Sequence, residues 1–183
     1  MIPLDGPLRA RYQNLWDTMV VQPQHVKEVN SIAMKIYGAK LNYTSIANEV
    51  KIPWCIVGII HYMECGLDFS SNLANGDSIQ RRTVNEPKGR PLGGEPPFSF
   101  NYCAIDALTY DRIINLTKDD IPRLLWALTK YNGFGYDKRG LNSPYIWGFT
   151  NHYTKGKYVA DGKYDPEAVS KQIGCAPLLK KLL

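Results

Sequence analysis

One carboxylate in the chain has the surroundings that general acid catalysis needs. Glu64 lies near the end of residues 52–66 (IPWCIVGIIHYMECG), a segment that is apolar nearly all round and therefore predicts a buried helix. Burial and the negative end of the helix dipole both disfavour a charged carboxylate, so we expect a raised pKa for Glu64. A carboxyl group that is still protonated near neutral pH can protonate a leaving oxygen. The alternative is a solvated Glu at a helix end.

A second carboxylate follows this helix, as glycoside hydrolysis would require. Asp68, Asp77 and Glu86 are the candidates, and Asp77 is the best placed because it follows the turn signal Asn75-Gly76. Thr83 lies six residues after Asp77, and its hydroxyl can help to hold a water. The alternative for Asp77 is a turn residue that caps its own backbone.

A second block, residues 131–163, combines aromatic rings with polar and flexible residues. Flat tyrosine and tryptophan faces can stack on sugar rings, amides and hydroxyls can bind N-acetyl groups, and glycines allow close backbone approach. The predicted substrate-binding residues are Tyr131, Asn132, Gly133, Tyr136, Ser143, Tyr145, Trp147, Asn151 and Tyr153. The alternative is aromatic core packing under a loop.

The elements that must position these residues are mostly helical. Apolar spacing, prolines and glycines predict helices over residues 8–19, 23–38, 44–50 (with Thr44 as N-cap), 53–66, 103–108, 121–133 and 165–173. Residues 67–85 are the predicted place of a small β-hairpin, with a strand over 78–84, and residues 86–97 form a loop. The fold class is therefore α+β, mostly α, with a central buried helix. We expect one domain over residues 1–183, with a helical N-terminal region (residues 1–66), a hairpin and loop region (residues 67–97) and a helical lobe (residues 98–183).

Three segments of the chain resemble the lysozyme superfamily. They are HYMECGLDFSSNLANGDSIQRRT, YNGFGY and SPYIWGFTNHYTKGKYVADG, and the resemblance covers roughly residues 50–163. It implies a two-lobe lysozyme-like fold and a muramidase that cleaves the glycan strand of peptidoglycan. By this resemblance Glu64 is the acid, Asp77 the second carboxylate and Thr83 its helper. The interval from Glu64 to Asp77 is longer than in phage-type lysozymes, which leaves the assignment of Asp77 open.

Other functions stay open on the sequence alone. Within the same fold they are a lytic transglycosylase, a chitosanase or chitinase, and a non-catalytic cell-wall-binding module. His61 and Cys65 lie four residues apart and can chelate a metal, but a second ligand pair is missing, so we expect no metal and no cofactor. Nucleic-acid binding would rest on the basic tail and the tyrosines, with adjacent basic pairs such as Arg81-Arg82 and Lys180-Lys181 but no recognised motif.

Charge and hydropathy indicate where the protein works. The net charge of +5 comes from residues 118–183, with 11 basic against 6 acidic residues, which favours an anionic partner such as a cell wall. No apolar run is long enough to span a membrane, and the first residues lack the pattern of a secretory signal. We expect a protein made in the cytoplasm that acts on the cell wall after release or delivery, as phage lysins do. The four cysteines are expected to be thiols, mostly in the core.

Overall fold

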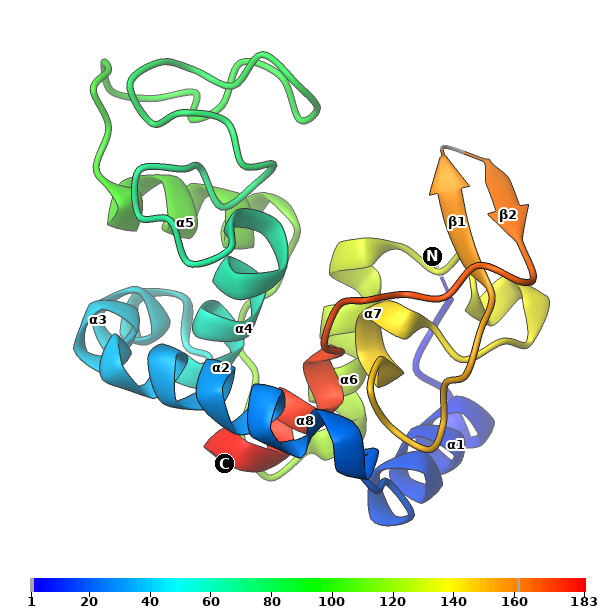
Figure 1. The fold of residues 1–183 in the computed structure, drawn as a ribbon. Coiled ribbons are helices and arrows are strands. Elements are labelled where there is room, and N and C mark those ends of the chain that lie inside the picture. The colour runs from blue at the N-terminus through cyan, green and yellow to red at the C-terminus, as the bar shows by residue number, and fades with distance from the viewer. Residues whose placement is uncertain (1, 161) are drawn as a thin grey trace. The chain divides into compact units, whose positions relative to one another are not determined.

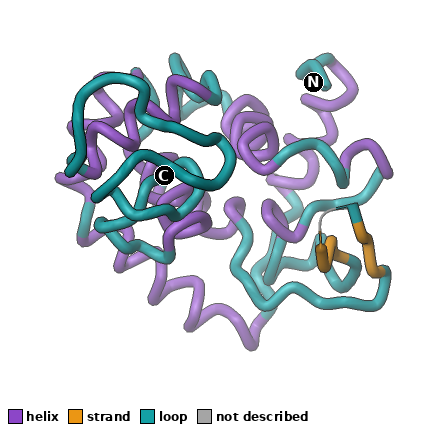
Figure 2. The backbone as a smooth tube through the Cα atoms, turned by 90° about the horizontal axis from the view of Figure 1, so that it is seen from above, coloured by secondary structure: helices purple, strands orange, loops and turns teal. Residues whose placement is uncertain are grey.

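The computed structural model describes residues 2–160 and 162–183 and is mostly helical. Figure 1 shows the order of the elements, and Figure 2 shows that strand structure is confined to one hairpin. The fold class α+β, mostly α, is therefore confirmed. The chain forms two compact units: unit 1 comprises Met1–Ala33 and Asp120–Leu183, and unit 2 comprises Met34–Asp119. The division into regions at residues 66 and 97 stays a prediction.

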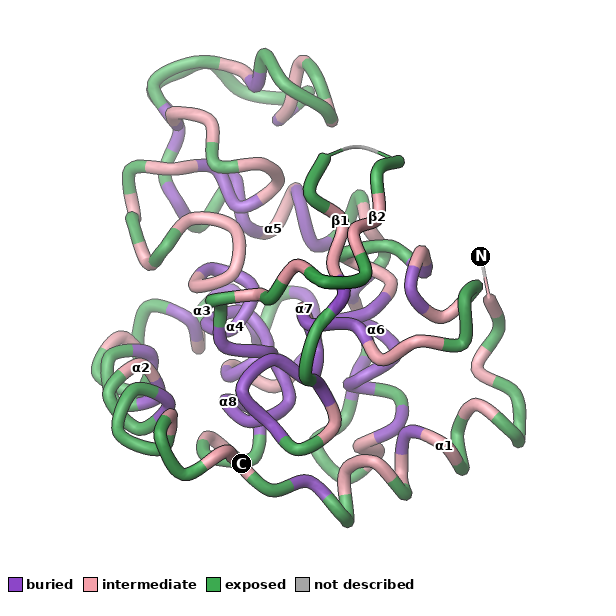
Figure 3. The backbone as a smooth tube through the Cα atoms, turned by 45° about the vertical axis from the view of Figure 1, so that its right-hand side comes forward, coloured by how far each residue is buried: buried purple, intermediate pink, exposed green. Residues whose placement is uncertain are grey.

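Unit 2 is built around the predicted central helix, α4 (Trp54–Cys65), together with α3 (Lys40–Val50) and α5 (Phe100–Tyr110). The residues of α4 from Cys55 to His61 are all buried (Figure 3). Gly58 allows this close packing, because a Cβ there would lie 2.4 Å from Ile36 Cγ2 and 3.0 Å from the Tyr43 ring. Ile36 comes from α2 (Val26–Gly38), a helix that contributes residues to both units.

Two local predictions in unit 2 are wrong. Helix α3 begins at Lys40, so Thr44 is not its N-cap; the Thr44 hydroxyl instead donates to the Lys40 carbonyl at 2.8 Å. The hairpin predicted over residues 67–85 is reduced to an isolated bridge between Ser71 and Ser78, and residues 78–84 form no strand. Side chains cause this difference, since the Asp77 carboxylate accepts the N–H of Val84 and thereby bends the segment into a loop.

Unit 1 is built on α1 (Gly6–Asp17) and α6 (Ile121–Asn132), which pack against each other. A buried hydrogen bond of 3.0 Å from the Tyr12 hydroxyl to Thr129 Oγ1 joins the two helices. Asp120 caps the start of α6 by accepting the N–H of Arg123, and its carboxylate also binds the Arg9 guanidinium. The predicted helices 8–19 and 121–133 are confirmed to within a few residues.

The rest of unit 1 holds two further helices, α7 (Pro144–Trp147) and α8 (Cys175–Leu182), and the only strands of the described chain, β1 (Lys157–Ala160) and β2 (Lys163–Asp165). The strands pair antiparallel. Two short 3-10 helices lie at Pro23–His25 and Asp137–Arg139. The backbones of α7 and α8 contact each other directly. The Gly174 N–H donates to the Gly148 carbonyl, and a Cβ on Gly174 would lie 2.4 Å from the Ile146 carbonyl oxygen.

The helix predicted over residues 165–173 is wrong, because the last helix begins at Cys175. The Asp165 carboxylate accepts the N–H groups of Glu167 and Ala168, and the Tyr153 hydroxyl accepts that of Ser170. These backbone N–H groups thus donate to side-chain oxygens and not to the carbonyls of a preceding helical turn. The four cysteines are thiols as predicted, three of them buried and Cys65 half-buried. No helix among the described residues has the length and apolar character that a membrane span needs.

Candidate functional site

Glu64 lies in the last turn of α4, where the helix leaves the core of unit 2. Its residue is half-buried, in contrast to the fully buried stretch from Cys55 to His61. Gly66 ends the helix in the left-handed conformation (φ 59°), with its N–H directed to the carbonyls of His61 and Tyr62. The sequence therefore predicted the position of Glu64 correctly: the end of a buried helix, at the edge of the core.

The turn Asn72–Asp77 packs against this end of α4. The Cys65 thiol donates to the Asn72 carbonyl at 3.3 Å, and the Gly76 backbone lies so close that a Cβ there would be 3.3 Å from the Glu64 carbonyl oxygen. Gly76 has φ 76°, a conformation that glycine adopts without strain. The turn therefore brings the segment that carries Asp77 to the end of the helix that carries Glu64.

The Asp77 carboxylate organises the loop that follows it. Oδ2 accepts the backbone N–H groups of Val84 (2.8 Å) and Asn85 (3.0 Å) and the Asn75 amide (3.1 Å), while Oδ1 accepts the Asn85 amide (2.8 Å). These hydrogen bonds, led by the Asn85 N–H, lower the pKa of Asp77. A carboxylate with a lowered pKa is a weak base but a persistent negative charge. The alternative interpretation of Asp77 as a residue that caps its own turn thus agrees with the contacts.

Thr83 is 2% exposed, and its hydroxyl is engaged on both sides. It donates to the Pro87 carbonyl at 2.5 Å and accepts the Arg90 N–H at 2.8 Å. The Arg90 guanidinium in turn binds both oxygens of Asp106 on α5, at 2.9 and 2.6 Å. The hydroxyl that was expected to hold a water therefore closes the loop 83–90 in this structure. The other two carboxylate candidates differ from each other. The Asp68 carboxylate accepts hydrogen bonds from the hydroxyls of Ser70 and Ser71, and Glu86 is exposed to solvent.

His61 lies in an aromatic cluster within unit 2. Its Nδ1 is 2.9 Å from the Tyr43 hydroxyl, and the rings of Phe69 and Phe100 pack on it at 4.6 and 4.4 Å between centroids. Burial lowers the pKa of His61 and so favours the neutral ring. Burial, followed by the charges of Glu64 and Asp68, raises the pKa of Cys65 to about 12. Among the described residues there is no group of three or more His, Cys, Asp or Glu side chains that could hold a metal ion.

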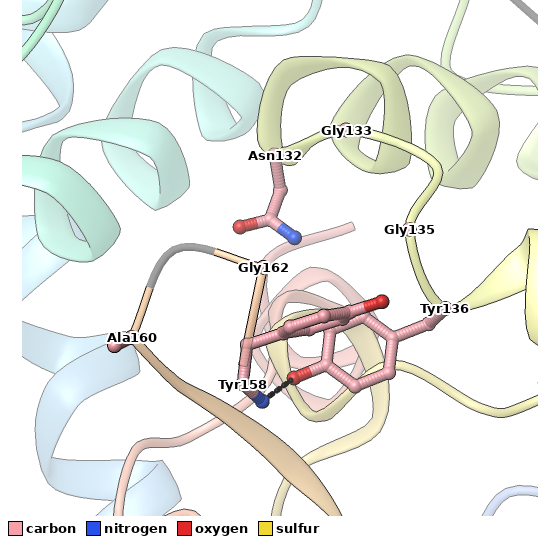
Figure 4. A pocket seen from close by; sticks show the side chains of 7 residues that line it. All are labelled: Asn132, Gly133, Gly135, Tyr136, Tyr158, Ala160 and Gly162. Carbon is pink, nitrogen blue, oxygen red and sulfur yellow. Dashed lines mark hydrogen bonds between the residues drawn. The ribbon is translucent and has the colours of Figure 1, made fainter. Parts of the chain in front are cut away.

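Unit 1 contains a pocket of about 460 Å³, here called the tyrosine pocket. Figure 4 shows the Asn132 side chain, at the end of α6, directed toward the space above the rings of Tyr136 and Tyr158. The Tyr136 hydroxyl accepts the Tyr158 N–H at 3.0 Å and so joins the segment after α6 to strand β1. The lining residues are Asn132, Gly133, Gly135, Tyr136, Tyr158, Ala160 and Gly162.

The lining of this pocket combines aromatic rings, a side-chain amide and exposed backbone. Two phenol rings supply apolar faces, one amide supplies a donor and an acceptor, and the glycines expose backbone. Gly133 ends α6 with φ 93° and so redirects the chain along the pocket wall. A smaller pocket of about 210 Å³ shares Asn132, Tyr136 and Tyr158 with it and adds Tyr145 and Lys157. The two pockets therefore adjoin each other, because three residues line both.

The structure divides the predicted binding residues into two sets. Asn132, Gly133 and Tyr136 line the tyrosine pocket, and Tyr145 lines its smaller neighbour. The remaining five do not line either one: Trp147 is core at 2% exposure, Ser143 caps α7, Asn151 binds the backbone of Thr18 and Val20, Tyr153 accepts from Ser170, and Tyr131 is half-buried in α6.

Sequence reasoning missed Tyr158, which forms a wall of both pockets. The signal that could have found it is the pair Asp161-Gly162, a hairpin turn signal between two short alternating segments. That signal predicts a hairpin with Tyr158 and Tyr164 on it. Its pairing with Tyr136 depends on a contact 22 residues away and is not legible from local pattern.

Glu64, Asp77 and Thr83 thus belong to unit 2, and all nine predicted binding residues belong to unit 1. Comparisons with protein-family models, with curated proteins and with solved structures find no match to this chain.

Proposed function

We propose that the protein is a glycoside hydrolase that cleaves the glycan strand of peptidoglycan, with Glu64 as its general acid. The observation that carries the proposal is the surroundings of Glu64. Glu64 is half-buried in the last turn of α4, which follows the buried stretch Cys55–His61, and the turn that carries Asp77, with its lowered pKa, packs against that same end.

In this mechanism Glu64 protonates the glycosidic oxygen as the bond to the anomeric carbon breaks. The negative charge of Asp77 stabilises the oxocarbenium-like transition state, a role that suits a carboxylate with a lowered pKa better than proton abstraction does. Water then adds to the anomeric carbon, and its second proton restores the Glu64 carboxyl group.

Features of unit 1 support a wall polymer as the substrate. The tyrosine pocket offers stacking faces and an amide for an N-acetylated sugar. Unit 1 has 13 Lys and Arg against 8 Asp and Glu residues, whereas unit 2 has nine of each. The whole net positive charge therefore belongs to the unit with the sugar-like pocket, which favours a polymer that bears carboxylates. Because the proposed substrate is peptidoglycan, we propose that the protein acts at the cell wall after its release or delivery.

One observation favours a second candidate, the lytic transglycosylase. The Thr83 side chain is 2% exposed and donates its single hydroxyl proton to the Pro87 carbonyl, so it has no hydrogen to offer a water. A transglycosylase needs no such water, because a hydroxyl of the same sugar attacks the anomeric carbon and leaves an anhydro end. Mass spectrometry of the released fragments separates the two reactions: reducing ends support hydrolysis, and anhydro ends support transglycosylation.

The first experiment compares clearing of purified peptidoglycan sacculi by wild type, Glu64→Gln and Glu49→Gln. Glu49 is the matched control, since it is an exposed residue of α3 in the same unit. We expect Glu64→Gln to lose about 10²–10⁴-fold in rate, the usual contribution of a general acid, and Glu49→Gln to clear like wild type. Circular dichroism establishes that all three fold.

The proposal fails if wild type clears nothing between pH 5 and 8 while it still binds sacculi; a non-catalytic wall-binding module would then be the better account. Turnover of chitin or chitosan oligomers without turnover of sacculi would keep the enzyme class and replace the substrate. Equal clearing by Glu64→Gln and wild type would remove Glu64 from the mechanism.

A further inference from the structure

An apolar patch lies on the surface of unit 2 where α2 ends and α3 begins. Its members are Met34, Tyr37 and Leu41, which are 69%, 54% and 87% exposed. Met34 and Tyr37 are three residues apart on α2 and so share one face of that helix, and Leu41 is the second residue of α3. These three residues are here called the Leu41 patch. Single exposed apolar residues are ordinary, whereas neighbouring ones mark a surface that contacts a partner.

The core of unit 2 fixes the direction in which this patch faces. On α2, Ile36 is fully buried and packs at Gly58 of α4. On α3, Tyr43 is fully buried, and its hydroxyl lies 2.9 Å from His61 Nδ1. The patch could turn inward only if these contacts were given up, so its exposure is a stable property of the fold.

Two lysines flank the patch. Lys35 follows Met34 and is exposed, and Lys40 precedes Leu41. Residues 29–48 contain these two lysines and neither Asp nor Glu. Within the part of the chain that the structure describes, neither ammonium group forms an ion pair with a carboxylate. The positive charge beside the patch is therefore not neutralised locally and is complementary to an anionic surface.

Two aromatic rings lie at the edge of the patch. The Tyr37 ring meets the ring of Trp54, the half-buried first residue of α4, edge-on with 5.9 Å between centroids. The Lys40 ammonium lies over both rings, 5.5 and 5.3 Å from their centroids, and so covers faces on which a sugar would stack. Tyrosine and tryptophan are enriched where lipid headgroups meet acyl chains, because each joins an apolar ring to a polar group.

A second copy of this chain fits the patch less well than a lipid surface does. A stable protein interface buries about 800 Å² on each partner, which is more than three side chains provide. A two-fold contact through the patch would also place Lys35 and Lys40 near the same lysines of the other copy, and like charges at an interface are unfavourable. Peripheral binding to a bilayer needs only a few inserted apolar side chains with cations beside them.

We infer that the Leu41 patch binds the surface of a bilayer that contains anionic phospholipid. Met34 and Leu41 enter the boundary between headgroups and acyl chains, and Tyr37 and Trp54 lie at the level of the headgroups. The two lysines pair with lipid phosphates. This interaction goes beyond the proposed function and does not depend on it.

The test is co-sedimentation of the full chain with lipid vesicles. One set of vesicles contains equal amounts of phosphatidylglycerol and phosphatidylcholine, and the other contains phosphatidylcholine alone. A lysine close to an anionic bilayer strengthens binding about fivefold, so we expect the mixed vesicles to bind at least about tenfold more tightly. The preference should decrease as salt is raised, because salt screens these charges.

Variants assign the binding to the patch. Met34→Gln and Leu41→Gln change exposed side chains, and each should weaken binding to mixed vesicles at least about fivefold through loss of apolar contact. Leu92→Gln is the matched control, since Leu92 is 72% exposed in the same unit. Lys35→Gln should weaken binding about fivefold, and Lys118→Gln, at another exposed lysine of unit 2, should not. Circular dichroism establishes that all variants fold.

Failure of wild type to sediment with the mixed vesicles would overturn the inference. Equal binding by Leu41→Gln and wild type would also overturn it, because the cations of unit 1 would then account for the binding. A dimer in analytical ultracentrifugation that Leu41→Gln dissociates, without vesicle binding by wild type, would assign the patch to a second copy instead. The clearing of sacculi tests the proposed function separately from all of these outcomes.

Discussion

At the scale of single residues, hydrogen bonds decide what each carboxylate of unit 2 can do. The two oxygens of Asp77 accept backbone and amide N–H groups, whereas Glu64 lies in the half-buried last turn of α4. One carboxylate is held charged by its donors, and we propose that the other supplies the proton. Such a difference between two carboxyl groups is what an acid and a stabilising anion require.

The Asp77 hydrogen bonds also stabilise the fold, and this contribution depends on pH. Since the folded-state pKa of Asp77 is lowered, its contribution is fully present above the unfolded value of about 3.9 and is lost as pH falls through the folded value. Asp77→Asn should therefore destabilise the protein at pH 7 by on the order of 1 kcal/mol, and the difference from wild type should shrink below about pH 4. Urea unfolding at pH 7 and pH 3 measures both.

Asp119→Asn is the control for this comparison, because Asp119 is exposed and belongs to the same unit. It should unfold like wild type at either pH. A gap between wild type and Asp77→Asn that stays constant down to pH 3 would contradict the interpretation of Asp77 as the charged centre of its loop.

At the scale of elements, the packing of α4 depends on the absence of one side chain. A Cβ at Gly58 would lie within 2.4 Å of Ile36 Cγ2, so α2 or α3 would have to move to accommodate it. Gly58→Ala should destabilise the protein by about 1–3 kcal/mol through overpacking, even though alanine is the better helix former. Thermal or urea unfolding checks this expectation.

Gly38 provides the matched substitution. It is the last residue of α2, and a Cβ there would meet nothing within 4 Å. Gly38→Ala should therefore leave stability unchanged or raise it slightly, since alanine restricts the unfolded chain. If both substitutions stabilise the protein equally, steric crowding does not limit the packing of α4.

The sequence predicted helices well where the apolar pattern and the stop signals agree. It predicted secondary structure poorly where polar side chains accept hydrogen bonds from backbone N–H groups. Pro53, the apolar run and Gly66 together define α4, and the structure follows them. The predictions of a hairpin over residues 67–85 and of a helix over residues 165–173 were wrong. The carboxylates of Asp77 and Asp165 accept backbone N–H groups that would otherwise donate within a strand pair or a helix. Apolar periodicity carries no information about such local hydrogen bonds.

The candidate site was predictable to a similarly limited extent. Glu64 is a local feature of one helix, so the sequence identifies it. The tyrosine pocket depends on Tyr136 and Tyr158 meeting across a turn-rich segment, and only Tyr136 was predicted. Trp147 and Ser143 were predicted as binding residues because of their residue types. In the structure Trp147 packs in the core and Ser143 caps the start of α7.

At the scale of the whole molecule, the net positive charge belongs to one of the two units. The excess of cations lies in unit 1, while unit 2 is neutral. Binding to sacculi should therefore weaken at least about tenfold between 50 and 500 mM salt, as screening shortens the reach of these charges. A sedimentation assay with Glu64→Gln measures binding without cleavage. Uncharged chitin serves as the control polymer, and salt-independent binding to sacculi would exclude an electrostatic contribution from unit 1.

The path of the chain through the two units has a consequence for biosynthesis. Unit 2 is one uninterrupted stretch, Met34–Asp119, whereas unit 1 needs α1 to meet α6, whose residues are more than one hundred positions later. On the ribosome, unit 2 is therefore complete while α1 still waits for its partner helix. Tyr12, the residue of α1 that is buried in the folded protein, stays uncovered during that interval.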